Sequence, residues 1–445
     1  MGRGHRATHH RSRQGLLAFT TALLIASTQA QETRPGSEVL GILDTVIVAG
    51  NTATETYVIL NEMTLGPGSE VTLEAIQYDR RRIYGLGLFT RVDIYYDSLQ
   101  ATRFLYVEVS ERWHLIPVPI FGFRDGDPKK VYFGAGILHN NLRGRNQKLF
   151  AFLTLGYDPS VAVSYSDPLF DHDNRLAFTS GLSYARVRNR SELYPGDFSV
   201  NNYTANLGLS KRFNLFETLA LSAGVRGVVV NEYQPGYTLD PEGRDIFLTA
   251  TLAFTYDSRD LYEYASRGQF AELYVARNGF GEGKVGFFRM GGDLRLYTPL
   301  PFGVTLLSRG VATIVTGGAV PGYMNTYFGY GERIRGYYTT VFEGESLAGG
   351  TLELRIPLFG PRTYDVSSLG IPQAFSFWRL GVSLALFGDT GVTWFRGQKI
   401  GLRSFSSGYG GGIDLLLPYS FVVRTSYAWS DAGQGEFILD LRRPL

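Results

Sequence analysis

The chain contains no cysteine, which excludes disulfide bonds, thiolate metal sites and cysteine nucleophiles. It also lacks any apolar run of the roughly 18 residues that a membrane-spanning helix needs, so a helical membrane protein is not expected. The formal net charge is only +2 over 445 residues, which argues against a strongly basic nucleic-acid-binding protein. A membrane β-barrel fits all three absences, because its strands alternate between apolar and polar residues.

Glycine and aromatic residues are abundant instead. The sequence holds 54 glycines, 28 tyrosines and 30 phenylalanines. Aromatic side chains favour strands, and glycine favours the turns between them. The mean hydropathy is close to zero, at -0.06, although 44% of the residues are hydrophobic. The composition therefore indicates many strands that mix apolar and polar positions.

Residues 1–30 have the organisation of a secretory signal peptide. The first 14 residues carry four arginines and no acidic residue, and a largely apolar run follows from Leu16 to Ala26. Small residues continue to Ala30, where we expect cleavage. Residues 31–41 are expected to form a polar linker.

Residues 42–112 show the pattern of a compact α+β domain. A first strand ends at the turn Gly50-Asn51, two helices follow, and two further strands complete the unit. The expected strands cover 45–51, 92–96 and 104–109, and the expected helices cover 54–63 and 73–84.

The spacing of residues also assigns roles within these two helices. Thr54 is the expected N-cap of the first helix. Residues 79–82 of the second helix, Asp79 to Arg82, are expected to form a polar face. The expected apolar contacts of the second helix are Leu73, Ile76, Ile83 and Tyr84.

From residue 113 to residue 445 the sequence alternates over segments of about ten residues, as a transmembrane strand requires. In one such segment Leu352, Leu354 and Ile356 alternate with Glu353 and Arg355. The pattern predicts an antiparallel transmembrane β-barrel of about 16 strands. The expected strands cover 115–124, 131–140, 148–157, 160–167, 175–187, 200–213, 217–231, 245–257, 268–279, 285–297, 304–316, 347–359, 379–394, 404–417, 420–429 and 435–443.

The connections should alternate between the two ends of this barrel. Turns after even-numbered strands are expected on the side of the small domain, and turns after odd-numbered strands on the far side. Long far-side connections are expected at 188–197, 232–244 and 317–346. The segment 360–378 would be an exception, a long turn on the domain side.

The small domain resembles a POTRA domain. The resemblance rests on Gly50 and Asn51 after the first strand, and on Gly87, Leu88 and Phe89 between the second helix and the next strand. It implies a periplasmic docking module that adds a partner's extended segment along a sheet edge.

The longest connection contains Ile334, Arg335, Gly336 and Tyr337, a run similar to the Val-Arg-Gly-Phe/Tyr motif of the bacterial surface antigen superfamily. That superfamily includes the core subunit of the β-barrel assembly machinery, its translocation-assembly relative and two-partner secretion transporters. A later strand carries the similar Phe-x-Asp-x-Gly element as Phe387, Asp389 and Gly391. The resemblance implies that the loop folds into the lumen and that Arg335 pairs with Asp389.

Further matches to the superfamily extend the likeness from residue 42 to the C-terminal region. They include 140–144 after the second barrel strand, 167–170 after the fourth, and 256–260 with Arg267 and Gly268 around the eighth and ninth. The sequence departs from the larger members in having one POTRA-like domain, and its last strand is followed by 442–445 without a terminal aromatic residue.

Catalytic motifs are absent from the sequence: there is no Gly-x-Ser-x-Gly elbow, His-Glu-x-x-His pair or Walker loop. Asp171, His172 and Asp173 can be drawn as a metal site, but they fall in a short turn, and a solvated turn is the favoured interpretation. We therefore expect no enzyme activity, no catalytic residue, no metal and no cofactor.

Two functions are consistent with these features. The favoured one is a factor in the bacterial outer membrane that receives unfolded polypeptide through its periplasmic domain and inserts or exports it through the barrel. The alternative is a passive pore or surface antigen with a plugged lumen. The expected partners are unfolded outer-membrane or secreted polypeptides and outer-membrane lipid, with accessory periplasmic or lipoprotein subunits as further candidates and no nucleic acid.

Overall fold

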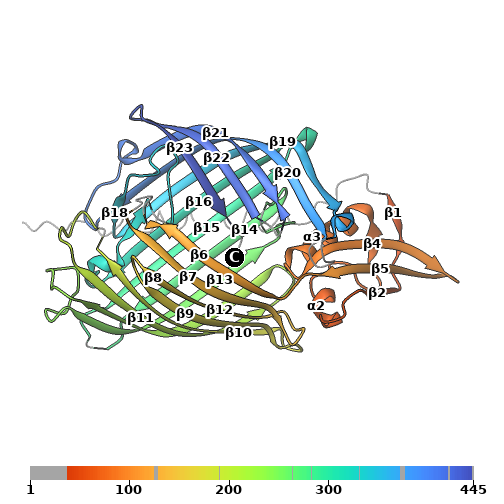
Figure 1. The fold of residues 1–445 in the computed structure, drawn as a ribbon, viewed down its shortest axis with the longest axis horizontal. Coiled ribbons are helices and arrows are strands. Elements are labelled where there is room, and N and C mark those ends of the chain that lie inside the picture. Colours follow the sequence, from red (N-terminus) through yellow and green to blue (C-terminus); the bar gives the residue numbers. More distant parts are fainter. Residues whose placement is uncertain are drawn as a thin grey trace, which may run out of the picture.

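The computed structural model describes residues 38–442 except 125–128, 190, 263, 282, 330, 371–375 and 419–420. The predicted signal peptide and most of the predicted linker lie outside these residues. A small N-terminal domain, orange in Figure 1, sits at one end of a long β-barrel. We call that end of the barrel the domain side and the opposite end the far side.

Sixteen strands form one antiparallel sheet in chain order, which confirms the predicted architecture. Every predicted barrel strand overlaps one observed strand, with ends that differ by a few residues. The strands are β6 (Leu115–Phe123), β7 (Val131–Leu142), β8 (Gln147–Gly156), β9 (Ser160–Asp171), β10 (Leu176–Arg188), β11 (Ser199–Arg212), β12 (Glu217–Val230), β13 (Arg244–Asp257), β14 (Gly268–Asn278), β15 (Phe287–Pro299), β16 (Thr305–Gly317), β19 (Ser346–Asp365), β20 (Phe377–Trp394), β21 (Ser406–Leu417), β22 (Phe421–Ser430) and β23 (Gly435–Arg442).

The two faces of the barrel wall differ in the way that the alternation predicts. On β19 the side chain of Leu352 is 60% exposed on the outside, whereas the neighbouring Glu353 is 3% exposed and faces the lumen. On β20, Leu386 is likewise exposed and Phe387 and Asp389 are buried. An apolar outer face and a charged lumen match a wall between lipid and a polar interior.

The long domain-side turn predicted at 360–378 is shorter in the structure, because part of it is strand. The β19–β20 ladder continues through Arg362 opposite Leu380 to Asp365 opposite Phe377, after irregularities between Pro357 and Arg362. Proline and glycine near 357–361 hide the strand signal there, because they normally interrupt strands. The hairpin connection is therefore limited to residues 366–376.

The N-terminal domain contains a three-stranded sheet and two helices. β2 (Thr45–Ala49) runs parallel to β5 (Thr102–Glu111), which pairs antiparallel with β4 (Phe89–Leu99). The helices are α2 (Thr56–Leu60) and α3 (Leu73–Gly85). An unpredicted strand, β1 (Val39–Ile42), pairs with β3 (Glu70–Thr72), so the predicted linker 31–41 is wrong for its last residues.

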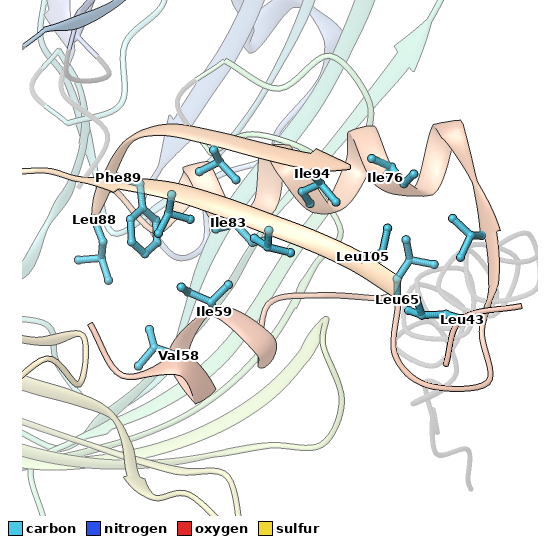
Figure 2. Packing of buried hydrophobic residues seen from close by; sticks show 14 residues of the cluster. Leu43, Val58, Ile59, Leu65, Ile76, Ile83, Leu88, Phe89, Ile94 and Leu105 are labelled. Carbon is cyan, nitrogen blue, oxygen red and sulfur yellow. The ribbon is translucent and has the colours of Figure 1, made fainter. Parts of the chain in front are cut away.

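The core of this domain lies between the helices and the sheet, as Figure 2 shows. Ile59 on α2, Ile83 on α3 and Phe89 on β4 are fully buried there. Leu88 and Leu105 complete its centre, and Leu88 and Phe89 belong to the Gly-Leu-Phe segment on which the POTRA resemblance rests. Burial of these side chains supplies most of the domain's hydrophobic stabilisation.

Three details of the predicted helices are wrong. Thr54 is not the N-cap of α2; that position is Glu55, and the hydroxyl of Thr54 accepts a hydrogen bond from Asn141 instead. Leu73 is 64% exposed and does not belong to the core cluster. Asp79 and Arg82 are buried: Asp79 accepts hydrogen bonds from the backbone of Thr64 and Leu65, and Arg82 donates one to Glu62.

Glu111, at the end of β5, holds the turn that follows β2. Its carboxylate accepts hydrogen bonds from Thr54 N at 2.6 Å and from Thr52 Oγ1 at 2.7 Å. Burial alone would raise the pKa of this carboxyl group. The hydrogen bonds from Thr54 and Thr52 outweigh it, so the pKa of Glu111 lies below its ordinary value.

This lowered pKa predicts a loss of order in the turn at acid pH. The stabilisation from Glu111 is complete above the unfolded-state pKa of about 4.3 and is lost as the pH falls through the lower folded-state pKa. In the mature protein, hydrogen exchange of residues 52–56, corrected for intrinsic rates, should quicken as the pH falls below about 4. Glu111→Gln should already show the faster exchange at neutral pH. Equal exchange in the two proteins across this pH range would contradict the role given to Glu111.

The N-terminal domain is fixed to the barrel rim through α3. Tyr78 Oη donates a hydrogen bond to the carbonyl of Ser258 at 2.9 Å, and Arg81 Nε lies 3.2 Å from Asp260 Oδ2. Glu74 forms an ion pair with Arg267. All three barrel residues belong to the connection 258–267 between β13 and β14, so this domain-side connection carries much of the contact.

Other contacts join further parts of the domain to the barrel. Glu62 Oε1 accepts a hydrogen bond from Arg212 Nη1 at 2.7 Å. Asn141 Nδ2 donates to Thr54 Oγ1 at 2.9 Å, and Asn140 Nδ2 donates to the carbonyl of Gly87 at 3.1 Å. The domain therefore contacts several separate turns of the rim, which fixes its orientation on the barrel.

Candidate functional site

The long far-side connection 318–345 turns back into the barrel. It contains a short hairpin of β17 (Thr326–Phe328) and β18 (Phe342–Gly344). Phe328 and Ile334 are buried against Leu347 of the barrel wall. We call residues 318–345 the lumen loop.

Arg335 lies at the centre of the contacts between the lumen loop and the wall. Its Nε and Nη2 donate to the two carboxylate oxygens of Asp389 at 2.6 and 2.8 Å. Its Nη1 donates to Glu353 Oε2 at 2.6 Å. The side chains of Asp389 and Glu353 are 4% and 3% exposed, so Arg335 neutralises two carboxylates that are largely shielded from solvent.

The other residues of the Phe-x-Asp-x-Gly element shape this contact. The ring of Phe387 lies 3.6 Å from the guanidinium carbon of Arg335, a cation–π arrangement. A Cβ at Gly391 would come within 2.9 Å of both Phe328 and Ile334, so a side chain there would force these two loop side chains to shift. Each member of the element therefore has a separate physical task.

A second ion cluster holds the loop on neighbouring strands. Glu332 accepts two hydrogen bonds of 2.8 Å from Arg309 of β16. Arg309 also binds Asp293 of β15, which pairs with Arg295 on the same strand. The loop is thus attached to β15 and β16 on one side and to β19 and β20 on the other.

The tip of the lumen loop contacts the last strand of the barrel. Glu436 Oε1, on β23, accepts hydrogen bonds from the backbone of Gly336 at 2.9 Å and of Tyr338 at 2.6 Å. Tyr337 donates its hydroxyl proton to Asp431, in the turn before β23. Gly336 has φ +102° and would place a Cβ 2.7 Å from the carbonyl of Trp429, so glycine is needed at this close approach.

Gly408 of β21 provides a further test of loop docking. A Cβ there would lie 1.7 Å from the carbonyl oxygen of Arg335, which no rearrangement of a flexible side chain can relieve. We expect Gly408→Ala to displace the lumen loop and expose it to protease added outside the membrane. Gly388→Ala on β20 is the matched control, because no atom lies within 4 Å of the added Cβ. If the lumen loop resists protease equally well in the Gly408→Ala and Gly388→Ala variants, the close packing of Gly408 against Arg335 is wrong.

The first and last strands of the sheet are its two edges. The sheet order runs from β23 to β6, and within the described residues no ladder joins these two strands. We call the boundary between β6 and β23 the seam. The lumen loop is hydrogen-bonded to one edge of this seam through Glu436.

The Arg335 cluster also extends toward the N-terminal domain. Glu353 Oε1 accepts a hydrogen bond from Arg355 at 2.8 Å, and Arg355 lies over the ring of Tyr264, 4.5 Å from its centroid. Tyr264 donates to Asp414 Oδ2 at 3.1 Å. Because Tyr264 belongs to the connection 258–267, polar contacts run from α3 through this connection to the lumen loop.

The structure brings Ile334 and Arg335 together with Phe387, Asp389 and Gly391, and it places Gly336 and Tyr337 at the loop tip, against Glu436 and Asp431. The remaining predicted residues lie in the N-terminal domain. Gly50 has φ +84° and would place a Cβ 2.0 Å from the carbonyl of Val109, and Asn51 donates to the carbonyl of Thr54 at 2.9 Å. Gly50, Asn51, Gly87, Leu88 and Phe89 therefore shape this domain and its junction with the barrel, far from the lumen loop.

Sequence patterns did not point to Glu353, Glu436, Arg309 or Glu332 as parts of the site. Glu353 had a signal, because an acidic residue on the lumen face of a wall strand needs a cationic partner. Glu436 had none, since its partners are backbone groups about 100 residues away. Among the described residues no cluster of His, Asp or Glu side chains is arranged to hold a metal ion. None of the described helices is long and apolar enough to cross a membrane.

Two family models match this chain. Residues 141–437 match the model of the Omp85 superfamily domain, and residues 42–112 match the model of the surface antigen variable number repeat, the POTRA domain. No match was found among functionally curated proteins.

Solved structures share the fold at low sequence identity. BamA from Haemophilus ducreyi lacking POTRA domains 1–3 has a TM-score of 0.54 and 15% identity, with 90% of this chain and 85% of that chain covered. CdiB from Escherichia coli has a TM-score of 0.55 and 13% identity, with 90% and 75% covered. CdiB from Acinetobacter baumannii has a TM-score of 0.52 and 15% identity, with 90% and 73% covered.

The Omp85 match alone spans more than half of the 445 residues, and the POTRA match occupies the domain that precedes the barrel. The chain therefore belongs to the Omp85 superfamily: it is an outer-membrane β-barrel with a periplasmic POTRA domain, of the family that serves outer-membrane protein assembly or secretion.

Proposed function

We propose that this protein receives unfolded polypeptide on its POTRA domain and inserts it into, or exports it across, the outer membrane through the barrel. The observation that carries the proposal is the seam. All other neighbouring barrel strands are joined by ladders, whereas β6 and β23 are not joined within the described residues. A barrel that served only as a pore would gain stability by closing this edge.

The POTRA domain offers an edge at which an unfolded chain can bind. The sheet order β2-β5-β4 leaves β2 at one edge, and Ile47 on this strand is 44% exposed. An extended client segment can add to such an edge through backbone hydrogen bonds, which require no particular sequence. This property suits a receptor for many unfolded clients.

The seam offers backbone donors and acceptors at the level of the membrane. A client strand cannot enter lipid with unpaired N–H and C=O groups, because each such group costs several kcal/mol there. Pairing with β6 or β23 would satisfy them while the client leaves the lumen. Client folding and apolar burial then drive the process, without a covalent step, a cofactor or nucleotide hydrolysis.

The lumen loop supports this proposal because it contacts β23, one of the two edge strands. It holds Glu436 of β23 by two hydrogen bonds, and Arg335 anchors the same loop on β19 and β20. The cavity that remains beside Arg335 has a volume of about 320 Å³, the size of a small-ligand pocket rather than of a polypeptide channel. The docked loop therefore fits a resting state in which the lumen is filled and β23 is fixed in place.

Depletion of the protein from its own cells tests the proposal. We expect the surface level of one or more other outer-membrane or secreted proteins to fall, and unfolded precursors of these proteins to accumulate in the periplasm. Re-expression should restore them. Unchanged levels of all outer-membrane and secreted proteins would contradict the proposal and favour the passive pore.

A further inference from the structure

A cleft lies where the POTRA domain meets the barrel rim, and it shares only Arg355 and Tyr264 with the Arg335 cluster described above. Its volume is about 790 Å³, within the range of ligand pockets of about 300–1,000 Å³. Its walls come from α3 and β4, from the connection 258–267, and from the inner side of the β19–β20 hairpin. We call this space the entry cleft.

The β19–β20 hairpin forms the barrel wall of the entry cleft because it extends beyond its neighbours. Thr305, the first residue of β16, pairs with Arg355, so the rest of β19 continues past the end of β16. On the other side the ladder between β20 and β21 stops at Gly381. The overhanging part of the hairpin reaches the POTRA domain, where Arg91 of β4 lies over the ring of Phe377.

The entry cleft opens on the lumen side of this wall, not on the lipid side. Arg355 and Pro357 of β19 line the cleft. The next residue, Leu358, points to the opposite face of the strand and is 62% exposed. Arg355 also belongs to the polar cluster around Glu353 in the lumen. A chain that binds in the cleft is therefore positioned to enter the lumen, and lipid faces the other side of the same strands.

The entry cleft carries an excess of positive charge. Its lining includes six arginines and three aspartates, namely Arg80, Arg81, Arg91, Arg355, Arg362 and Arg379 against Asp93, Asp260 and Asp365. Arg355 is paired with Glu353 and Arg362 faces outward, so four arginines stand against the three aspartates in the cleft. Arg80 and Arg91 share Asp93 as an ion-pair partner, and Arg81 pairs with Asp260. The side chains of Arg80 and Arg91 are 44% and 38% exposed, so these guanidinium groups are accessible from solvent.

The β19–β20 hairpin can bind a client chain through its side chains rather than through backbone hydrogen bonds at a strand edge. Pro357 and Pro361 line the entry cleft and have no backbone N–H to donate to an added strand. Arg379 faces the POTRA domain and lies over Tyr84, whereas Arg362, directly opposite Leu380, lies over Phe359 on the outer face of the hairpin. The stacked guanidinium group of Arg379 is held in place, which favours bidentate binding of a carboxylate.

We propose that the entry cleft binds acidic segments of unfolded client polypeptide between the POTRA domain and the lumen. The inference rests on the proposed function and adds a client preference to it. A few extended residues that carry Asp or Glu would fill the cleft, with their carboxylates on the arginines and any aromatic side chain against Tyr84 or Phe377.

The test uses the mature protein in nanodiscs of zwitterionic phosphatidylcholine. Two fluorescent, unstructured 15-residue peptides are compared, which differ only in having Glu or Gln at the same alternate positions. We expect the Glu peptide to bind about tenfold more tightly than the Gln peptide, and the difference to shrink at high salt. The double variant Arg80→Gln/Arg91→Gln, which removes the two accessible arginines that share Asp93, should abolish most of this preference. Lys399→Gln/Arg403→Gln, which removes the same two charges from exposed positions on the far side, should keep it.

The outcomes separate this inference from the proposed function. If both peptides bind equally, and the cleft variant binds them as the wild type does, the entry cleft does not select acidic segments and the proposed function stands. If no unfolded polypeptide binds at all, the proposed function itself fails. If phosphatidylglycerol added to the nanodiscs displaces the Glu peptide completely, the arginines bind lipid phosphate and the client preference is overturned.

Discussion

Replacement of Arg335 by alanine is expected to abolish most of the activity of this protein. The change leaves Asp389 and Glu353 without their shared cation, although their side chains are 4% and 3% exposed. Breaking a buried ion pair by removing one partner costs about 3–5 kcal/mol, which corresponds to more than about 100-fold in the ratio of docked to undocked loop. The measurement is rescue of depleted cells by the variant, with the amount of folded barrel in the membrane as reference.

Arg335→Lys is the graded control for this prediction. Lysine keeps the charge but cannot bind Asp389 through two parallel N–H groups while also binding Glu353, so we expect partial rescue. A double-mutant cycle with Asp389→Asn should show strong coupling between the two residues. Full rescue by Arg335→Ala at normal membrane levels would show that loop docking is not needed for activity.

A disulfide across the seam is expected to block activity as strongly. The chain has no native cysteine, so introduced pairs report only on the chosen positions. One cysteine at 117–120 of β6 and one at 437–440 of β23 can be tested in combination, since a disulfide requires Cα atoms about 4.4–6.8 Å apart. The best-forming pair should stop rescue of depleted cells, and a reductant should restore it.

The matched control places the disulfide in a ladder that need not open. Thr425 and Leu439 are direct partners between β22 and β23, so cysteines there join the last two strands and leave the seam free. We expect this variant to rescue normally under oxidising conditions. If the seam disulfide forms completely and rescue is still normal, clients do not pass between β6 and β23.

The barrel could be predicted from the sequence because every wall strand has two different environments. Leu352 faces outward and Glu353 faces the lumen, and this difference repeats along each strand as a local pattern. Where this pattern is interrupted, the strand could not be predicted: Pro357 and Pro361 hid the last residue pairs of the β19–β20 ladder. The short strand β1 was missed for a similar reason, because it follows a polar segment and pairs with residues about 30 positions away.

The candidate site could be predicted in part. Arg335 and Asp389 were identified by their resemblance to motifs, and the structure places them in contact. Glu353 and Glu436 contribute equally direct contacts, but neither lies in a motif, and their partners come from other elements. Asp79 and Arg82 show the same limit, since their charges suggested a surface face whereas hydrogen bonds inside the domain allow them to be buried.

The most direct test of the central claim, that unfolded polypeptide is assembled or exported by this barrel, is reconstitution. Mature protein is inserted into liposomes, and a urea-denatured outer-membrane barrel or secreted protein is diluted onto the side that carries the POTRA domain. We expect the yield of membrane-inserted or protease-protected client to rise about tenfold over empty liposomes, and Arg335→Ala to give the yield of empty liposomes. Equal client yields with and without the wild-type protein, across several clients of each kind, would contradict the claim.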